Sequence, residues 1–257
     1  MSHSTQGGLI AALIPAFQEE SFIHEVVRRT LPFVDKVLVV DDGCTDATLS
    51  EARRAGAEVI SHLKNLGKGQ AIKTGLKHLS GTNYYHVIIL DGDLQHVPEE
   101  IGLFVEKIRE ADPAMIVGSR ARENGEMPFV RKCTNQFMSG LISLVCGQRI
   151  PDSQCGFRSM RADVIDLIRE NCHTSGYDFE SEMLLVVSRQ GHRILSVPVS
   201  TVYGTEVSKI RPVPDTIRFF KLILRYLFFR KSRAFSAGKE VSSAPAIPEP
   251  PASPPHL

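Results

Sequence analysis

Several features that would indicate particular classes of protein are missing from this sequence. Its 257 residues include five cysteines, an odd number with no Cys-x-x-Cys pair, so neither a zinc site nor a disulfide framework is predicted. Reduced thiols in a cytoplasmic protein are expected instead. No apolar run has the length of a transmembrane helix. Residues 1–8 lack lysine and arginine, and the short apolar run at 9–14 leads into Glu19 and Glu20, which does not fit a signal peptide.

The chain also lacks an excess of charge of either sign. Its formal net charge is +1, which gives no general attraction to nucleic acid. The charge is uneven, however, because residues 209–233 contain eight lysines and arginines and one acid. That segment carries +7 and the remainder −6. With 42% hydrophobic and 23% charged residues, the composition is that of a globular domain, so only the local basic segment needs an explanation.

Short apolar strands alternate with amphipathic helices over the first part of the chain. Strands are predicted at residues 9–15, 36–40, 58–61, 85–90 and 115–118, and a helix follows each of the first four. This alternation is typical of a Rossmann-like, mostly parallel α/β sheet with helices on both faces. Later residues are less regular, with helices expected near 129–146, 160–170 and 178–190 and a strand at 193–199.

The two ends of the chain differ from its centre. Residues 1–8 are predicted to be a flexible segment, and residues 234–257, with six prolines after residue 240, a disordered tail. Residues 211–233 form a predicted basic amphipathic helix. One stripe of it holds Arg218, Lys221 and Arg225, and another holds Ile217, Phe220, Leu224 and Leu227. The pattern fits a helix lying on an anionic membrane, and a terminal helix packed on its own domain is the alternative.

The sequence Asp91-Gly92-Asp93 directly follows the strand predicted at residues 85–90. In open α/β sheets, ligands bind just beyond the carboxyl ends of strands. Two carboxylates one residue apart supply hard oxygen ligands for one divalent ion, and Mg²⁺ is typically held by such carboxylates together with substrate phosphates. The pattern therefore indicates a metal–diphosphate site, with an ordinary Asp-Gly turn as the alternative interpretation.

Other strand ends carry polar residues too. Pro15, Phe17 and Glu19 could hold a flat base by stacking and by accepting from its N–H edge, and Asp42 could accept from a base or a ribose. Helix capping by these acids is the alternative. Carboxylates clustered along one sheet edge repel each other without a ligand or a cation, which favours binding. Arg120 follows a fifth strand, where it could reach a phosphate or form a surface ion pair.

The segment Asn65-Leu66-Gly67-Lys68-Gly69 resembles a phosphate-binding loop. It lacks the Walker A spacing and the third glycine of a dinucleotide-binding fingerprint. These absences disfavour a P-loop NTPase and a nicotinamide-dependent dehydrogenase.

Six short motifs together resemble those of the family-2 glycosyltransferases with the GT-A fold. The similarity is greatest to dolichyl-phosphate mannosyltransferases and bacterial polyprenyl-phosphate glycosyltransferases, and it spans residues 9–210. In chain order the motifs are Ile14-Pro15-Ala16-Phe17-Gln18-Glu19-Glu20, Val39-Val40-Asp41-Asp42-Gly43-Cys44-Thr45-Asp46, Gly67-Lys68-Gly69-Gln70-Ala71, Leu90-Asp91-Gly92-Asp93-Leu94-Gln95-His96-Val97-Pro98, Gly118-Ser119-Arg120 and Cys155-Gly156-Phe157-Arg158. The family commonly has Asn where this chain has Gln18.

This resemblance implies an enzyme and assigns roles to individual residues. The nucleotide of a nucleoside-diphosphate sugar is expected at Pro15, Phe17, Glu19, Val40 and Asp42, and its diphosphate at Asp91, Gly92 and Asp93. A Mg²⁺ or Mn²⁺ ion is expected at Asp91, Asp93 and Gln95. Arg120 and Lys209 are expected at the phosphate of the donor or the acceptor.

The implied reaction is an inverting, metal-dependent transfer of a hexose from a donor of the GDP-mannose or UDP-glucose type to polyprenyl phosphate. That acceptor is already anionic near neutral pH and needs no strong general base. A saccharide hydroxyl is the alternative acceptor and does need a base, for which Asp152, Glu180 and Glu182 are candidates. A silent nucleotide-sugar-binding module is a third interpretation. A lipid acceptor implies a cytoplasmic protein at a membrane surface, with a membrane-protein partner in place of the transmembrane helices of larger relatives.

Overall fold

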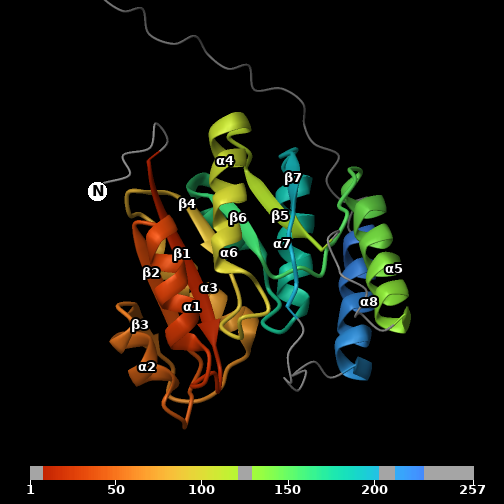
Figure 1. Ribbon diagram of the computed structural model, residues 1–257. Helices are drawn as coiled ribbons and strands as arrows, with labels where there is room; N and C mark the ends of the chain where they lie inside the picture. The colour runs from red at the N-terminus through yellow and green to blue at the C-terminus, as the bar shows by residue number, and fades with distance from the viewer. Residues whose placement is uncertain (1–7, 121–128, 203–211, 229–257) are drawn as a thin grey trace, which may run out of the picture.

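A computed structural model describes residues 8–120, 129–202 and 212–228 (Figure 1). The flexible N-terminus and the proline-rich tail expected from the sequence lie almost wholly outside these residues. The described chain forms one 7-stranded sheet in the order β3-β2-β1-β4-β6-β5-β7. The strands are β1 (Leu9–Ala16), β2 (Lys36–Asp41), β3 (Glu58–Ser61), β4 (Tyr84–Ile89), β5 (Met115–Ser119), β6 (Arg158–Arg161) and β7 (Ile194–Pro198).

The sheet is mostly parallel, as the sequence predicts. β1 pairs in parallel with both β2 and β4, β2 with β3, and β5 with β7. β6 is the exception, because it lies antiparallel between β4 and β5. No strand was expected there, since three of the four residues in Arg-Ser-Met-Arg are polar and the segment shows no run of apolar residues.

Helices cover both faces of the sheet. They are α1 (Ile23–Thr30), α2 (Thr48–Arg54), α3 (Lys68–Leu79), α4 (Ile101–Ala111), α5 (Phe129–Cys146), α6 (Ala162–Asn171), α7 (Asp178–Arg189) and α8 (Pro212–Phe228), with short 3₁₀ turns at Leu31–Phe33 and Pro98–Glu100. α3, α6 and α7 lie together on one face, and α1, α2 and α4 lie on the other. α5 and α8 lie side by side outside α7 (Figure 1).

The core explains why the central strands have no polar alternation. Both faces of the sheet are covered, so strand residues are buried on either side. Ala11, Ala12, Leu13 and Ile14 of β1 are all fully buried. The apolar face predicted for the helix after residue 67 is also confirmed, because α3 buries Ile72, Gly75, Leu76 and Leu79.

The last helix is both packed and apolar on its outside. Its inner face buries Phe219, Leu222, Ile223 and Tyr226, while its outer face exposes a second apolar row at 40% to 75%, namely Ile217, Phe220, Leu224, Leu227 and Phe228. Arg225, which the sequence places in one stripe with Arg218 and Lys221, forms an ion pair with the buried Glu182 of α7.

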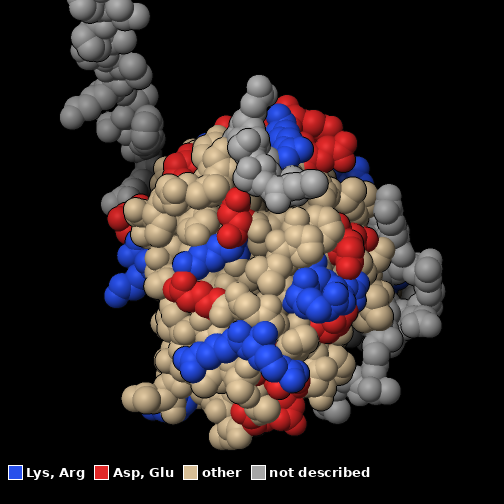
Figure 2. All heavy atoms as spheres, turned by 60° about the vertical axis from the view of Figure 1, so that its left-hand side comes forward, with Lys and Arg blue, Asp and Glu red and all other residues tan. Residues whose placement is uncertain are grey.

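Charged side chains on the outside of the domain are mixed in sign. On the face that Figure 2 shows, basic and acidic groups lie next to one another among uncharged residues. Surface pairs such as Arg28–Glu25 and Arg29–Glu99 are examples of this arrangement. Within the described residues, no helix combines the length and the apolar character needed to cross a membrane.

Candidate active site

The ends of the neighbouring strands β1 and β4 bring two of the predicted acidic junctions together. Both strands run in the same direction, so the residues that follow them emerge at one edge of the sheet. A methyl group added at Gly92 would lie 3.5 Å from the Cγ atom of Glu19. The Asp91–Asp93 turn and Glu19 therefore lie next to each other at this edge of the sheet. Pro15 and Val40 are buried beneath this edge, and Phe17 is half-buried.

The acidic turn is shaped by its own side chains. The backbone N–H of Asp91 donates to Nδ1 of His96 at 3.2 Å, and the N–H of Gln95 donates to Oδ1 of Asp93 at 3.0 Å. His96 stacks on Phe157 with ring centroids 5.1 Å apart. Burial lowers the pKa of His96, which keeps the ring neutral and lets Nδ1 act as an acceptor.

Lys68 is the cation at this turn, and sequence reasoning did not assign it a role. Its Nζ lies 2.7 Å from Oδ1 of Asp91 and 3.3 Å from Oε1 of Glu180. Burial by itself would lower the pKa of Lys68, but the two carboxylates outweigh it and raise that pKa above its ordinary value. Burial likewise opposes ionisation of Asp91, yet Lys68 holds the pKa of Asp91 below its usual range. Lys68 and Asp91 are therefore both ionised near neutral pH.

One sequence signal could have drawn attention to Lys68. It is the first residue of α3, where the partial positive charge of the helix N-terminus disfavours a cation. A lysine at that position needs nearby carboxylates, and the acidic strand ends were the obvious source.

The carboxylate of Asp42 is occupied by contacts within the protein. It is 2% exposed, and its carboxylate accepts from the N–H groups of Leu66 at 3.0 Å and Gly67 at 2.8 Å. The same carboxylate lies 2.7 Å from Nδ1 of His62, whose Nε2 lies 2.9 Å from Oγ1 of Thr74. Asp42 thus holds the loop that carries Lys68 in place. Its predicted contact with a nucleotide remains a prediction.

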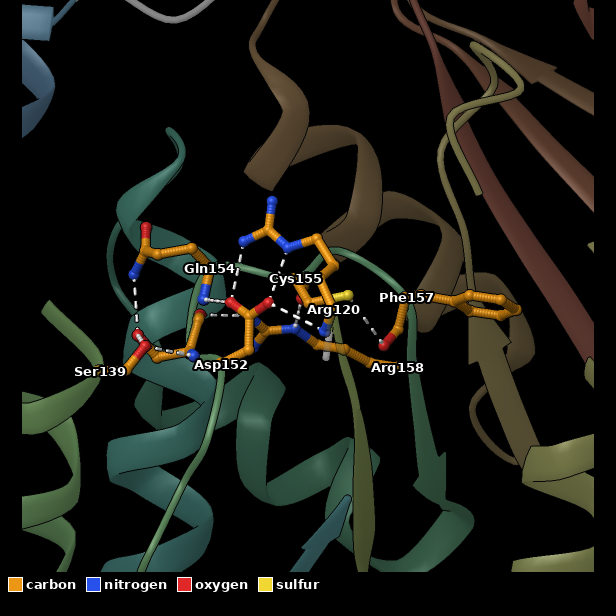
Figure 3. Close-up of polar contacts among 8 residues, drawn as sticks. Arg120, Ser139, Asp152, Gln154, Cys155, Phe157 and Arg158 are labelled. Carbon is orange, nitrogen blue, oxygen red and sulfur yellow. Dashed lines mark hydrogen bonds and ion pairs between the residues drawn. The ribbon is translucent and has the colours of Figure 1, made fainter. Parts of the chain in front are cut away.

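Arg120 and Asp152 form an ion pair in which both partners are largely buried (Figure 3). Nε and Nη2 of Arg120 donate to Asp152 at 2.6 and 2.8 Å. Burial would raise the pKa of Asp152, but the contacts with Arg120 outweigh it and lower that pKa. A carboxylate in this state accepts a proton weakly, which argues against Asp152 as a general base.

A second base candidate, Glu182, is also taken up by structural contacts. It is fully buried and accepts from the N–H groups of His173 and Thr174, both at 2.8 Å, and from Arg225. Glu180 is therefore the base candidate that lies at the acidic turn, where it contacts Lys68.

Nearby, the buried Arg158 donates to the carbonyl groups of Cys155 and Ser153, both at 2.8 Å, and fixes the loop that precedes β6 (Figure 3).

The acidic turn suits a divalent ion whose remaining ligands come from the substrate and water. Asp91, Asp93 and Gln95 offer oxygen ligands, as Mg²⁺ and Mn²⁺ prefer. Across residues 8–120, 129–202 and 212–228, no three or more histidine, cysteine, aspartate or glutamate side chains gather as a self-sufficient metal site. Two carboxylates with the remaining positions left to phosphate and water match the usual way of holding Mg²⁺. Lys209, the other predicted phosphate ligand, lies outside the described residues.

Gln18 joins the loops after β1 and β2. Its Nε2 donates to Oγ1 of Thr45 at 2.9 Å, and its Oε1 accepts from the N–H of Thr45 at 3.0 Å. Gln18 has a φ of +57°, a left-handed conformation that asparagine adopts more readily than most residues.

Comparison with known proteins identifies the family. The model of the family described as "Glycosyl transferase family 2" matches residues 11–169. The chain belongs to this family. The recognition made from its motifs is confirmed, and the protein is a glycosyltransferase.

Relatives in sequence include two archaeal proteins of similar length. An uncharacterised protein of Methanocaldococcus jannaschii is 30% identical over 226 residues, which cover 85% of this chain and 93% of that protein. The UDP-N-acetylglucosamine–dolichyl-phosphate N-acetylglucosaminyltransferase of Methanococcus voltae is 29% identical over 246 residues, or 88% of this chain and 97% of that enzyme. The undecaprenyl-phosphate 4-deoxy-4-formamido-L-arabinose transferase of Klebsiella pneumoniae is 34% identical over 176 residues, but this match covers 64% of this chain and 52% of that enzyme.

Solved structures confirm the GT-A fold. Glucosyl-3-phosphoglycerate synthase from Mycobacterium tuberculosis, in complex with Mn²⁺, UDP and glucosyl-3-phosphoglycerate, superimposes with a TM-score of 0.66. The alignment covers 90% of this chain and 82% of that one at 20% identity. A further structure of that synthase contains Mg²⁺ and UDP.

Proposed function

We propose that this glycosyltransferase moves a hexose from a nucleoside diphosphate to a polyprenyl phosphate at a membrane surface, with inversion at the anomeric carbon. The observation that carries the donor half of this proposal is the acidic turn at the end of β4, with Glu19 beside it and Lys68 in ion-pair contact with it. A diphosphate needs cations, and this edge of the sheet offers a site for a divalent ion together with a lysine.

The residues of the site would act on the leaving group. As the bond to the sugar breaks, negative charge develops on the diphosphate, and a divalent ion at Asp91, Asp93 and Gln95 would stabilise it. Lys68 supplies a further positive charge at the same turn. Phe17 and Glu19 are proposed to hold the nucleotide, with Pro15, Val40 and Asp42 supporting them. Attack on the face of the sugar opposite the diphosphate inverts its anomeric centre.

Two observations support the proposed acceptor: the contacts of the candidate general bases, and the acceptors for which two relatives are named. Asp152 is paired with Arg120 and Glu182 accepts from backbone N–H groups, so neither is free to remove a proton from a sugar hydroxyl. The third base candidate, Glu180, lies beside the ammonium group of Lys68, which disfavours its taking up a proton. A phosphate monoester is anionic near neutral pH and needs no such base. The relatives from Methanococcus voltae and Klebsiella pneumoniae are named for lipid-phosphate acceptors. Arg120 and Lys209 are the proposed contacts of the phosphate of the donor or the acceptor.

The outer apolar row of α8 is proposed to contact the membrane in which such an acceptor resides. Phe220 of this row lies beside Phe137 of α5, with ring centroids 6.4 Å apart, and Phe137 and Leu144 of α5 are 58% and 72% exposed. We call this set the α5–α8 surface: Phe137, Leu144, Ile217, Phe220, Leu224, Leu227 and Phe228. Lys221 is exposed among these residues, which suits anionic lipid headgroups.

The donor half is tested by thermal shift. UDP, GDP and their hexose conjugates are added with Mn²⁺, with Mg²⁺ or with EDTA to the wild-type protein and to Asp93→Asn. A rise in melting temperature that needs both nucleotide and metal, and that Asp93→Asn loses, supports the proposal. Equal shifts in EDTA, or in the variant, contradict the metal–diphosphate assignment.

A further inference from the structure

Lys68 is held at the acidic turn by a rigid loop. The N–H of Gly67 donates to Asp42, and the N–H of Gln70 donates to the carbonyl of Ser175 at 3.2 Å. A methyl group on Gly69 would lie 2.7 Å from the Cβ of Phe179, so the start of α3 is also packed tightly against the start of α7. The backbone at Lys68 therefore has little room to move, and only its long side chain can change partner.

The ammonium group of Lys68 lies between two carboxylates at different distances. Nζ is 2.7 Å from Asp91, within hydrogen-bonding distance, but 3.3 Å from Oε1 of Glu180. Among the described residues that buried Oε1 atom has no hydrogen-bond partner. A methyl group on Gly156 would lie 2.9 Å from Asp91, 3.0 Å from Lys68 and 3.1 Å from Glu180, so glycine is needed for the three groups to meet. Glu180 is thus a second, incompletely satisfied partner within reach of the same cation.

We infer that Lys68 is an exchangeable internal cation of the metal site: it neutralises Asp91 in the donor-free protein and turns to Glu180 when a divalent ion takes its place. This inference rests on the proposed donor site at Asp91 and Asp93. Asp91 cannot give its full charge to a divalent ion while its Oδ1 binds an ammonium group. Glu180 lowers the cost of the exchange, because the displaced cation keeps a buried anionic partner.

The exchange couples the metal to the nucleotide. A divalent ion alone must displace Lys68, which weakens its binding. A nucleoside diphosphate brings further oxygen ligands to the ion and a further anionic partner for the lysine. Metal and nucleotide are therefore expected to raise each other's affinity, and by linkage the two gains are equal.

The experiment measures binding of Mn²⁺ alone by the loss of its free electron paramagnetic resonance signal. Lys68→Met is expected to bind Mn²⁺ about tenfold more tightly than the wild type, a difference equivalent to about 1.4 kcal/mol. Lys77→Met removes an exposed lysine from the same helix and is expected to match the wild type. Lys68→Gln, which can still donate to Asp91, replaces the methionine variant if thermal unfolding shows that the latter does not fold.

Glu180 supplies the second half of the test. Glu180→Gln is expected to weaken binding of Mn²⁺ in the wild-type background, because Lys68 loses its second partner. In Lys68→Met the same change is expected to have a smaller effect, since no cation needs to move. Additive effects of the two substitutions would contradict the exchange, because independent sites show no interaction energy.

The outcomes separate this inference from the proposed function. If Mn²⁺ binds the wild type together with UDP or GDP, and Lys68→Met binds Mn²⁺ alone no better than the wild type, the exchange is wrong and the donor site stands. If no variant binds Mn²⁺ with or without a nucleotide, the metal assignment fails and the exchange fails with it.

Discussion

Arg225 of α8 forms an ion pair with Glu182 of α7, a residue with no exposed surface. The same glutamate accepts from the backbone of His173 and Thr174, so the pair ties the last helix to the loop before α7. The other face of α8 is left with an apolar row. Packing on the domain and contact with a membrane are therefore not exclusive, because different faces of one helix would serve each.

The two faces of α8 are expected to respond differently to substitution. Phe220→Ser with Leu224→Ser should weaken co-sedimentation with anionic liposomes and leave the melting temperature nearly unchanged. Leu222→Ser, on the buried face, should lower the melting temperature with or without lipid, because it places a hydroxyl in an apolar environment and leaves a cavity.

The control for the outer face is Leu63→Ser. Leu63 is fully exposed and lies far along the chain from α8, so its loss should not change liposome binding. Equal co-sedimentation of the wild type and the Phe220/Leu224 variant, at low and at high salt, would show that the α5–α8 surface does not bind the membrane.

Asp93→Asn is expected to lower the transfer rate by at least about 100-fold, because the neutral amide holds a divalent ion poorly and such ions contribute several kcal/mol to catalysis. The fold should persist, since Asp93 is half-buried in a surface turn. Asp163→Asn is the matched control. It removes an acid in the first turn of α6, which pairs with Arg161 at the end of β6. Near-normal turnover of Asp93→Asn, measured with saturating metal, would show that the turn does not hold the ion.

Asp42→Asn separates a structural role from direct contact with the nucleotide. The structure predicts a loss of about 3 kcal/mol in the free energy of unfolding, since hydrogen bonds to a buried carboxylate are each worth about 1.5 to 3 kcal/mol. Donor affinity should fall as well, because the loop that carries Lys68 loses its anchor. Urea denaturation and donor titration check both effects. Unchanged stability with lost donor affinity would instead favour the contact with base or ribose that the sequence predicts.

His86 gives the stability of the protein a pH dependence. Burial lowers the pKa of His86 to about 4 from its ordinary value of 6.5, and its Nδ1 lies 2.9 Å from Oγ of Ser159. Between these two pH values the unfolded chain binds a proton that the folded chain does not, so stability falls as the pH falls through this window. The expected loss between pH 7 and pH 5 is about 2 kcal/mol from this group.

The contribution of His86 is isolated by substitution. Denaturation curves of His86→Gln at pH 7 and pH 5 should show a smaller difference than those of the wild type, and His24→Gln on α1 should retain the full difference. An unchanged difference in His86→Gln would show that this histidine is not the source.

Much of the fold could be predicted from the sequence because local pattern determines it. The five strands predicted before residue 120 all form. Four of them contain at least three consecutive apolar residues, and β3 has two, Val59 and Ile60. β6 could not be predicted, because a segment with three polar residues in four becomes a strand only when β4 and β5 lie on either side of it. The ion pair between Arg225 and Glu182 could not be predicted for a related reason. α8 is apolar on two faces, and the pattern alone does not indicate which face packs.

The candidate site could be predicted only in part. Strand-end acids are visible in a sequence, and the structure does bring Glu19 beside the Asp91–Asp93 turn. Their partners are not visible, because they are backbone groups or side chains distant in the chain. Asp42 finds two N–H groups more than twenty residues away, and Lys68 finds Asp91 at a similar separation.

The central claim is tested most directly by the product of the transfer. The wild-type protein is incubated with a nucleotide sugar identified by thermal shift, Mn²⁺ or Mg²⁺, and either a polyprenyl phosphate, the same polyprenol without its phosphate, or an oligosaccharide. Lipids are then extracted and analysed by mass spectrometry. The account predicts one hexose joined to the polyprenyl phosphate, none on the other two acceptors, and no product with Asp93→Asn. A hexose transferred to the oligosaccharide and not to the lipid phosphate would contradict it.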